Sequence, residues 1–144
     1  MARKYQVNFL VRMTNRMTAG MIRKNSAPLG VYLLTVHGRK TGKSYSAPVN
    51  LIEHDGKRWL VSPYGEVNWV KNARAAGEIS LYRNKVEQTL KIHELGPQQS
   101  APILKEYINQ LGIVRPYFDV PPEASLEDFE AEASWHPVFL LEEK

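Results

Sequence analysis

A short basic segment bounded by glycines carries the side chains best suited to bind an anion. The sequence from His37 to Ser44 follows an apolar run and ends in Gly-Lys-Ser, as a nucleotide-binding P-loop does. The spacing argues against a P-loop, because Gly38 and Gly42 enclose three residues instead of four and a strand pattern follows. Two interpretations remain: a tight turn whose backbone N–H groups and cations bind a phosphate or carboxylate chain, or a solvated basic hairpin. The cations are Arg39, Lys40 and Lys43.

A second candidate pair is Trp69 and Asn72, which lie three residues apart in a segment compatible with a helix. Residues at that spacing share one helix face, so the two side chains can line a pocket together. An asparagine offers a donor and an acceptor to an amide-like ring edge, and an indole offers a flat apolar wall. The alternative is that Trp69 belongs to the core and Asn72 caps the surface.

Composition excludes several chemistries. The 144 residues include no cysteine, which removes disulfides, thiolate metal ligands and a cysteine nucleophile. The sequence contains no Gly-x-Ser-x-Gly motif, so nothing in it indicates a serine nucleophile. The four histidines lack the spacing of paired metal ligands, so we predict no metal site and assign them structural or surface roles. They are His37, His54, His93 and His136.

Charge is distributed unevenly along the chain. Residues 1–58 hold 11 Lys/Arg against 2 acids, whereas residues 59–144 hold 8 against 13, so the two parts carry +9 and −5. The basic part indicates an anionic partner, which can be a nucleic acid, a lipid surface or a phosphorylated small molecule. We expect no nucleic-acid partner, because the basic turn lacks the interleaved aromatic side chains of single-strand binders.

Alternating apolar and polar residues predict the strands that position these candidates. They cover Val31 to His37, Tyr45 to Glu53, Lys57 to Ser62, Glu78 to Arg83, Val86 to Glu94 and His136 to Leu141. Hairpin turns are expected at Asp55-Gly56 and Asn84-Lys85. Further helices are expected over residues 67–76, 101–111 and 125–133, the last with Ser125 as its N-cap. We therefore predict a mainly β fold with peripheral helices (α+β), an antiparallel barrel in a single domain over residues 1–144.

The N-terminal segment predicts an amphipathic basic helix over residues 5–24. Residues 1–24 contain six Lys/Arg and no acid, beside an apolar stripe that includes Leu10, Met13 and Met17. This helix either covers the barrel or lies on anionic lipid. We favour the covering role, because an exposed apolar stripe promotes aggregation. No apolar run approaches the length of a membrane span and no secretion signal is evident, so we expect a cytoplasmic protein, with peripheral membrane contact as the alternative.

These segments together resemble a known family, the deazaflavin-dependent nitroreductases and quinone reductases that use coenzyme F-420. The resemblance runs from about Leu34 to Leu141 and rests on the order and spacing of five short sequences. They are Gly38-Arg-Lys-Thr-Gly42, Ala47-Pro48, Asp55-Gly56, Trp69-Val-Lys-Asn72-Ala-Arg-Ala75 and His136-Pro-Val-Phe-Leu-Leu141. The resemblance implies a six-stranded antiparallel split β-barrel of the FMN-binding split-barrel type.

The resemblance also implies which residues bind the coenzyme. The phosphate and oligoglutamate tail would lie on the basic turn. The deazaflavin ring would run beside the strand that follows and against the segment after the third strand, with Trp69 and Asn72 closing the site. Tyr117 is our candidate catalytic residue, a donor to the acceptor oxygen, with a packing role as the alternative. The tail residues are Arg39, Lys40, Thr41 and Lys43, and the ring residues are Pro48, Val49, Asn50, Ser62, Tyr64 and Gly65.

The activity that the resemblance implies is hydride transfer from the reduced coenzyme to a small-molecule electron acceptor, such as a quinone, an enone or a nitroaromatic. Two alternatives remain open. One is an FMN-dependent oxidoreductase on the same barrel, in which the basic turn holds a single phosphate. The other is a non-catalytic module that binds a coenzyme or a lipid-like ligand. A homodimer is compatible with each of these.

Overall fold

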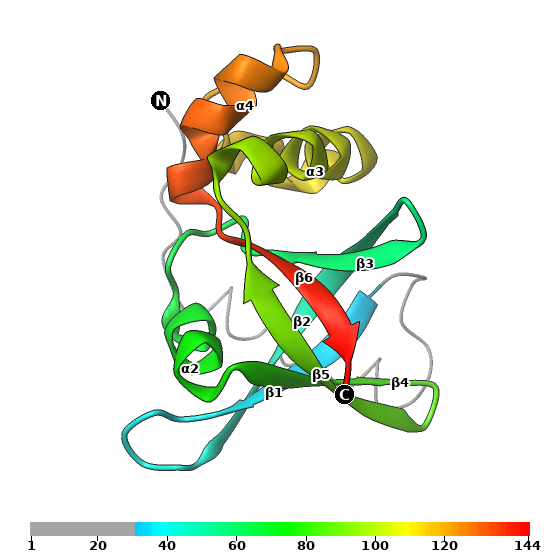
Figure 1. The fold of residues 1–144 in the computed structure, drawn as a ribbon, viewed down its shortest axis with the longest axis vertical. Coiled ribbons are helices and arrows are strands. Elements are labelled where there is room, and N and C mark those ends of the chain that lie inside the picture. Colours follow the sequence, from blue (N-terminus) through cyan, green and yellow to red (C-terminus); the bar gives the residue numbers. More distant parts are fainter. Residues whose placement is uncertain (1–30) are drawn as a thin grey trace.

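The computed structural model describes residues 31–144. Its six strands form a closed antiparallel barrel in the order β1-β2-β3-β6-β5-β4 (Figure 1). The strands are β1 (Val31–His37), β2 (Ser44–His54), β3 (Lys57–Val61), β4 (Glu78–Arg83), β5 (Val86–Glu94) and β6 (Val138–Glu143). The expected six-stranded antiparallel barrel is therefore confirmed. The expected helix over residues 5–24 lies outside the described residues.

The two predicted hairpin turns join neighbouring strands. Asp55 and Gly56, between β2 and β3, have φ angles of 54° and 73°. Asn84 and Lys85, between β4 and β5, have φ angles of 53° and 64°. Positive φ at both central residues matches the right-handed twist of the flanking strands, which fixes the register of each hairpin.

Short helices connect and cover the strands. They are α2 (Asn68–Ala76), α3 (Pro97–Gln110), η1 (Gly112–Tyr117), α4 (Leu126–Glu132) and η2 (Ala133–Trp135). Helix α3 begins four residues before the expected start at residue 101, because Pro97 occupies the first helical position, where a missing N–H costs little. Ser125 caps α4 as predicted, and its Oγ accepts a hydrogen bond from the backbone N–H of Asp128 at 3.2 Å.

Strand β6 begins at Val138, two residues later than the expected start at His136. The 3-10 turn η2 precedes it, and Pro137, which has no backbone N–H, separates the turn from the strand. The backbone N–H of Ser62 nevertheless donates to the Pro137 carbonyl at 2.9 Å, which extends the contact between β3 and β6.

Two apolar clusters hold the fold together. One fills the barrel beside α2 and includes Leu34, Leu60 and Phe139. The other lies under α3 and α4 and includes Tyr107 and Phe129. Helices α3 and α4 pack together at one end of the barrel, whereas α2 lies apart from them, against β1 and β4 (Figure 1). None of the helices in residues 31–144 is long and apolar enough to cross a membrane.

Candidate functional site

The basic turn after β1 is closed by its own backbone. The Gly38 N–H donates to the Lys43 carbonyl at 2.7 Å, and the Gly42 N–H donates to the Gly38 carbonyl at 2.9 Å. Gly42 has a φ of 73°, which favours glycine at this point of the turn. The four predicted tail-binding residues are all exposed around the turn, so an anion can approach them from solvent. They are Arg39, Lys40, Thr41 and Lys43.

Asn72 connects the basic turn to α2. Its side chain is buried, with 4% exposed, and its Oδ1 accepts two hydrogen bonds from Arg39. The donors are the Arg39 backbone N–H at 3.1 Å and its Nη1 at 2.8 Å. The Asn72 carbonyl group is therefore occupied in orienting Arg39. The pairing spans 33 residues of sequence, so the spacing of Trp69 and Asn72 did not reveal it.

Two adjoining pockets lie beside the turn. The larger, of about 610 Å³, is lined by the predicted ring residues Pro48, Val49, Asn50 and Tyr64 and by Trp69. The smaller, of about 230 Å³, is lined by Arg39, Lys40, Thr41, Trp69 and Asn72. Three residues, Tyr45, Asn68 and Trp69, line both pockets. The structure thus brings nine of the predicted site residues to two neighbouring pockets.

Four predicted site residues lie outside both pockets. Ser62 is buried, and its Oγ donates to the Gly65 carbonyl at 2.6 Å, which closes the loop after β3. Gly65 has a φ of 85° in this loop. Lys43 projects from the basic turn. Tyr117 meets the ring of Tyr64 edge to face, with 4.8 Å between ring centroids, so it contacts the larger pocket through Tyr64.

The sequence analysis missed several lining residues, among them Tyr45, Asn68 and Tyr107. Tyr45 and Asn68 flank the junction of the two pockets, and Tyr107 lines the larger pocket from α3. Tyr107 is 2% exposed, and burial raises the pKa of its phenol above the usual value. An aromatic residue at apolar spacing on a helix is typical of a core position, so nothing in the sequence distinguished Tyr107 from its neighbours.

Arg74 fixes the segment that enters α2. Its guanidinium donates from Nε and Nη2 to the two carboxylate oxygens of Glu94, at 2.7 and 2.6 Å, and Nη1 lies 3.1 Å from Glu66 Oε1. The hydrogen bonds to Glu94 hold the pKa of the Arg74 guanidinium above its usual value. Because Glu66 lines the larger pocket, the bidentate pair with Glu94 connects the pocket wall to β5.

A buried histidine also supports the wall of the larger pocket. His136 Nδ1 donates to the Pro63 carbonyl at 2.9 Å, and Nε2 lies 2.9 Å from Glu132 Oε2. Phe118 stacks on the imidazole at 3.9 Å. Burial lowers the pKa of His136, opposed by the nearby Glu132 carboxyl. Since Pro63 lines the pocket, His136 has a structural role there, in agreement with the role assigned to the histidines from sequence.

We expect His136 to make the protein less stable in acid. Its folded-state pKa lies below the ordinary value, so the unfolded chain takes up the proton first and stability falls as pH drops through about 6.5. One such group changes the free energy of unfolding by at most about 1.4 kcal/mol per pH unit. Urea unfolding of wild type and His136→Phe between pH 8 and pH 5 should show a smaller acid dependence for the variant. Identical dependences would contradict this prediction.

Comparisons with known proteins identify a family and several solved structures with the same fold. The model of the F420H(2)-dependent quinone reductase family matches residues 7–113. No curated protein matches significantly. Among solved structures, an F420-H2 dependent reductase shares 20% identity with a TM-score of 0.54, covering 79% of this chain and 95% of that one. A protein described as a domain-swapped dimer shares 18% identity with a TM-score of 0.57, covering 93% and 97%.

A heme binding protein from Mycobacterium smegmatis shares the fold at 13% identity and a TM-score of 0.54, covering 86% of this chain and 49% of that one. At such identities the solved structures show the barrel fold and no more. The family model, in contrast, matches well over half of the sequence. The chain therefore belongs to the F420H(2)-dependent quinone reductase family, which indicates reduced coenzyme F-420 as its cofactor.

Proposed function

We propose that this protein transfers a hydride from reduced coenzyme F-420 to a small organic acceptor, with quinones as the principal class. The observation that carries the proposal is the junction of a cationic turn and an aromatic-walled pocket, which share Tyr45, Asn68 and Trp69. A ligand with a planar ring and a long anionic tail needs these two environments side by side.

The dimensions and chemistry of the site fit such a coenzyme. The larger pocket, of about 610 Å³, lies in the usual range for ligand sites and has room for a tricyclic ring next to part of an acceptor. The exposed cations of the turn suit a phosphate and a chain of carboxylates, with Arg39 held in place by Asn72. The backbone of β2 at Pro48, Val49 and Asn50 offers polar groups to a ring edge.

When bound, the reduced coenzyme supplies a hydride, which carries two electrons and one proton to the acceptor. A quinone becomes a hydroquinone after a second proton arrives from solvent. The protein's own contribution is orientation: contacts of the turn with the remote tail help to hold the ring against the acceptor. Trp69 forms a wall of the pocket and is supported by Phe139, with 6.1 Å between ring centroids. Ser62 and Gly65 set the shape of the loop that follows β3.

The range of acceptors extends the proposal. Enones and nitroaromatics accept a hydride by related chemistry, so activity with either would widen the acceptor range.

We assign Tyr117 the role of a donor that acts at the pocket edge together with Tyr64, on the basis of their ring contact. A homodimer is also proposed, in line with the structural relative described as a domain-swapped dimer.

Steady-state oxidation of reduced coenzyme F-420 by a water-soluble naphthoquinone tests this function. The proposal predicts turnover that saturates in both substrates. Absence of turnover with quinone, enone and nitroaromatic acceptors, in a protein that binds the coenzyme, would favour a non-catalytic binding role. A purified protein that carries FMN and ignores coenzyme F-420 would favour the FMN alternative.

Lys40→Ala and Lys43→Ala should each weaken coenzyme binding by about 3- to 10-fold at low salt, because a charge-assisted contact is lost. The loss should shrink in 0.5 M salt, where exposed charges are screened. Titration of each variant with the coenzyme at low and at high salt, followed by coenzyme fluorescence, measures these affinities. Lys85→Ala is the matched control, since Lys85 is exposed in the β4–β5 turn and lines neither pocket. Wild-type affinity in both variants at low salt would exclude the turn as the tail site.

Deletion of residues 2–24 should lower thermal stability and raise the KM for the acceptor, while coenzyme affinity stays near wild type. The expectation follows from the apolar stripe of this segment and from Val31, the first residue of β1, which lines the larger pocket. Vesicle sedimentation tests the alternative. A truncated protein that is equally stable and active, but no longer sediments with anionic vesicles as the full chain does, would make the segment a membrane contact.

A further inference from the structure

Tyr107 stands apart from the other tyrosines that line the larger pocket. Tyr45 and Tyr64 are 48% and 39% exposed, whereas Tyr107 is 2% exposed and is one of the largest fully buried side chains. It nevertheless lines the pocket, from the last turns of α3. Tyr107 is therefore a nearly buried phenol that forms part of the pocket wall.

The hydroxyl of Tyr107 has no hydrogen-bond partner among residues 31–144. Its oxygen is also not one of the fully buried side-chain atoms in this range that lack a partner. Buried tyrosine hydroxyls normally find a partner, because an unmade hydrogen bond in a low-dielectric site is unfavourable. Because Tyr107 lines the pocket, a ligand bound there is the candidate acceptor for this bond.

The protonation state suits a donor. Burial raises the pKa of the Tyr107 phenol, and the neighbouring Tyr64 raises it further. Tyr107 therefore stays neutral at physiological pH and keeps its O–H. A neutral donor in a water-poor site stabilises negative charge as it develops on an acceptor oxygen.

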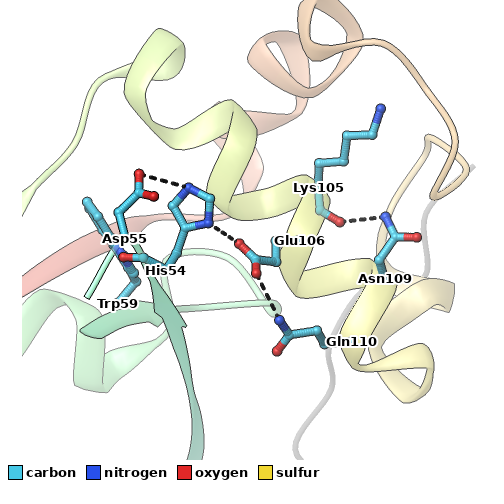
Figure 2. Close-up of polar contacts among 7 residues, drawn as sticks. All are labelled: His54, Asp55, Trp59, Lys105, Glu106, Asn109 and Gln110. Carbon is cyan, nitrogen blue, oxygen red and sulfur yellow. Dashed lines mark hydrogen bonds and ion pairs between the residues drawn. The ribbon is translucent and has the colours of Figure 1, made fainter. Parts of the chain in front are cut away.

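Contacts next to Tyr107 hold α3 against the barrel. Glu106 Oε2 pairs with His54 Nδ1, and Glu106 Oε1 accepts from Gln110 Nε2 at 3.1 Å (Figure 2). His54 also faces Asp55 at 3.3 Å, and the His54 carbonyl accepts from Trp59 Nε1 at 3.2 Å (Figure 2). These interactions connect the middle of α3 to the β2–β3 hairpin. A donor on a fixed helix is already oriented when the acceptor binds.

We propose that the Tyr107 hydroxyl donates a hydrogen bond to the carbonyl oxygen of the acceptor and thereby favours quinones over nitroaromatics. This inference rests on the proposed reductase function. Hydride transfer to a quinone places the new charge on an oxygen that a single fixed donor can meet, whereas a nitro group presents two oxygens. Tyr107 acts from the pocket wall itself, in addition to Tyr117, which meets the pocket edge through the ring of Tyr64.

Tyr107→Phe removes only the hydroxyl and is the test variant, with Tyr82→Phe, in β4 and lining neither pocket, as its matched control. We expect the kcat for a water-soluble naphthoquinone to fall about 10- to 100-fold in Tyr107→Phe, as loss of a donor to a developing oxyanion does. The kcat for nitrobenzene should fall less than threefold, and coenzyme affinity should change less than twofold. Equal kcat values for wild type and Tyr107→Phe with the quinone would overturn the inference.

A binding measurement separates this inference from the proposed function. In the presence of oxidised coenzyme no turnover occurs, so the Kd of the naphthoquinone can be read from tryptophan fluorescence. We expect about 2- to 10-fold weaker binding to Tyr107→Phe, the range for one net hydrogen bond. If wild type is active and both variants match it in kcat and Kd, the inference about Tyr107 fails alone. If wild type neither binds the coenzyme nor reduces any acceptor, the proposed function fails.

Discussion

Glu132→Ala is expected to lower the free energy of unfolding by about 2–5 kcal/mol, because it removes the partner of a buried imidazole nitrogen and of a partly buried backbone N–H. The groups are His136 Nε2 and the backbone N–H of Asp119, which donates to Glu132 Oε1 at 2.9 Å. Glu132 and His136 have side-chain exposures of 6% and 3%, so water does not readily replace the lost carboxylate. The substitution should also disturb the larger pocket, because His136 donates to the carbonyl of Pro63, which lines that pocket.

Urea unfolding monitored by tryptophan fluorescence measures this loss, and the melting temperature should fall by roughly 6–15 °C. Glu130→Ala is the matched control from the same helix, where the side chain is only partly buried. It should cost less than about 1 kcal/mol. If the two variants are equally stable, the buried contact between Glu132 and His136 adds nothing to the free energy of unfolding, which would contradict this prediction.

Trp69→Ala should weaken coenzyme binding by about 10- to 100-fold, because the indole is the aromatic wall where the two pockets meet. It should also lower stability moderately, since the contact with Phe139 is lost. Circular dichroism confirms that the variant is folded, and coenzyme titration gives the affinity. Wild-type affinity in a folded Trp69→Ala protein would remove the indole from the site.

Trp135→Ala is the control for this experiment. Sequence alone predicts that Trp59 and Trp135 act mainly through folding. Trp59 fits this expectation, because it packs against the cluster under α3 and donates to the His54 carbonyl. Trp135 does not, because it is 67% exposed and lines neither pocket. Its replacement should therefore leave both stability and coenzyme affinity almost unchanged.

The barrel was predictable because its signals are local. Asp55-Gly56 and Asn84-Lys85 specify turns that force adjacent strands to pair, and alternation along each strand indicates which face is buried. The remaining pairs of the barrel, β3 with β6, β5 with β6 and β1 with β4, follow once six such strands must cover one core. The start of α3 was less clear, because two prolines, Pro97 and Pro102, both suit the first turn of a helix.

The site was predictable only in part. Glycine spacing and clustered cations locate the basic turn, and helical spacing places Trp69 and Asn72 on one face. The bond between Arg39 and Asn72 depends on packing of α2 against the end of β1, which the sequence does not encode in any short pattern. The same holds for Tyr107, whose access to the pocket depends on how α3 packs on the barrel.

The most direct test of the central claim is titration of the wild-type protein with coenzyme F-420, reduced and oxidised, followed by the fluorescence of the ring. The account predicts saturable binding at one site per chain, with an affinity that falls as salt is raised and that is reduced in Lys40→Ala and Trp69→Ala. Binding that ignores salt and both substitutions, or no binding of either form of the coenzyme, would contradict it.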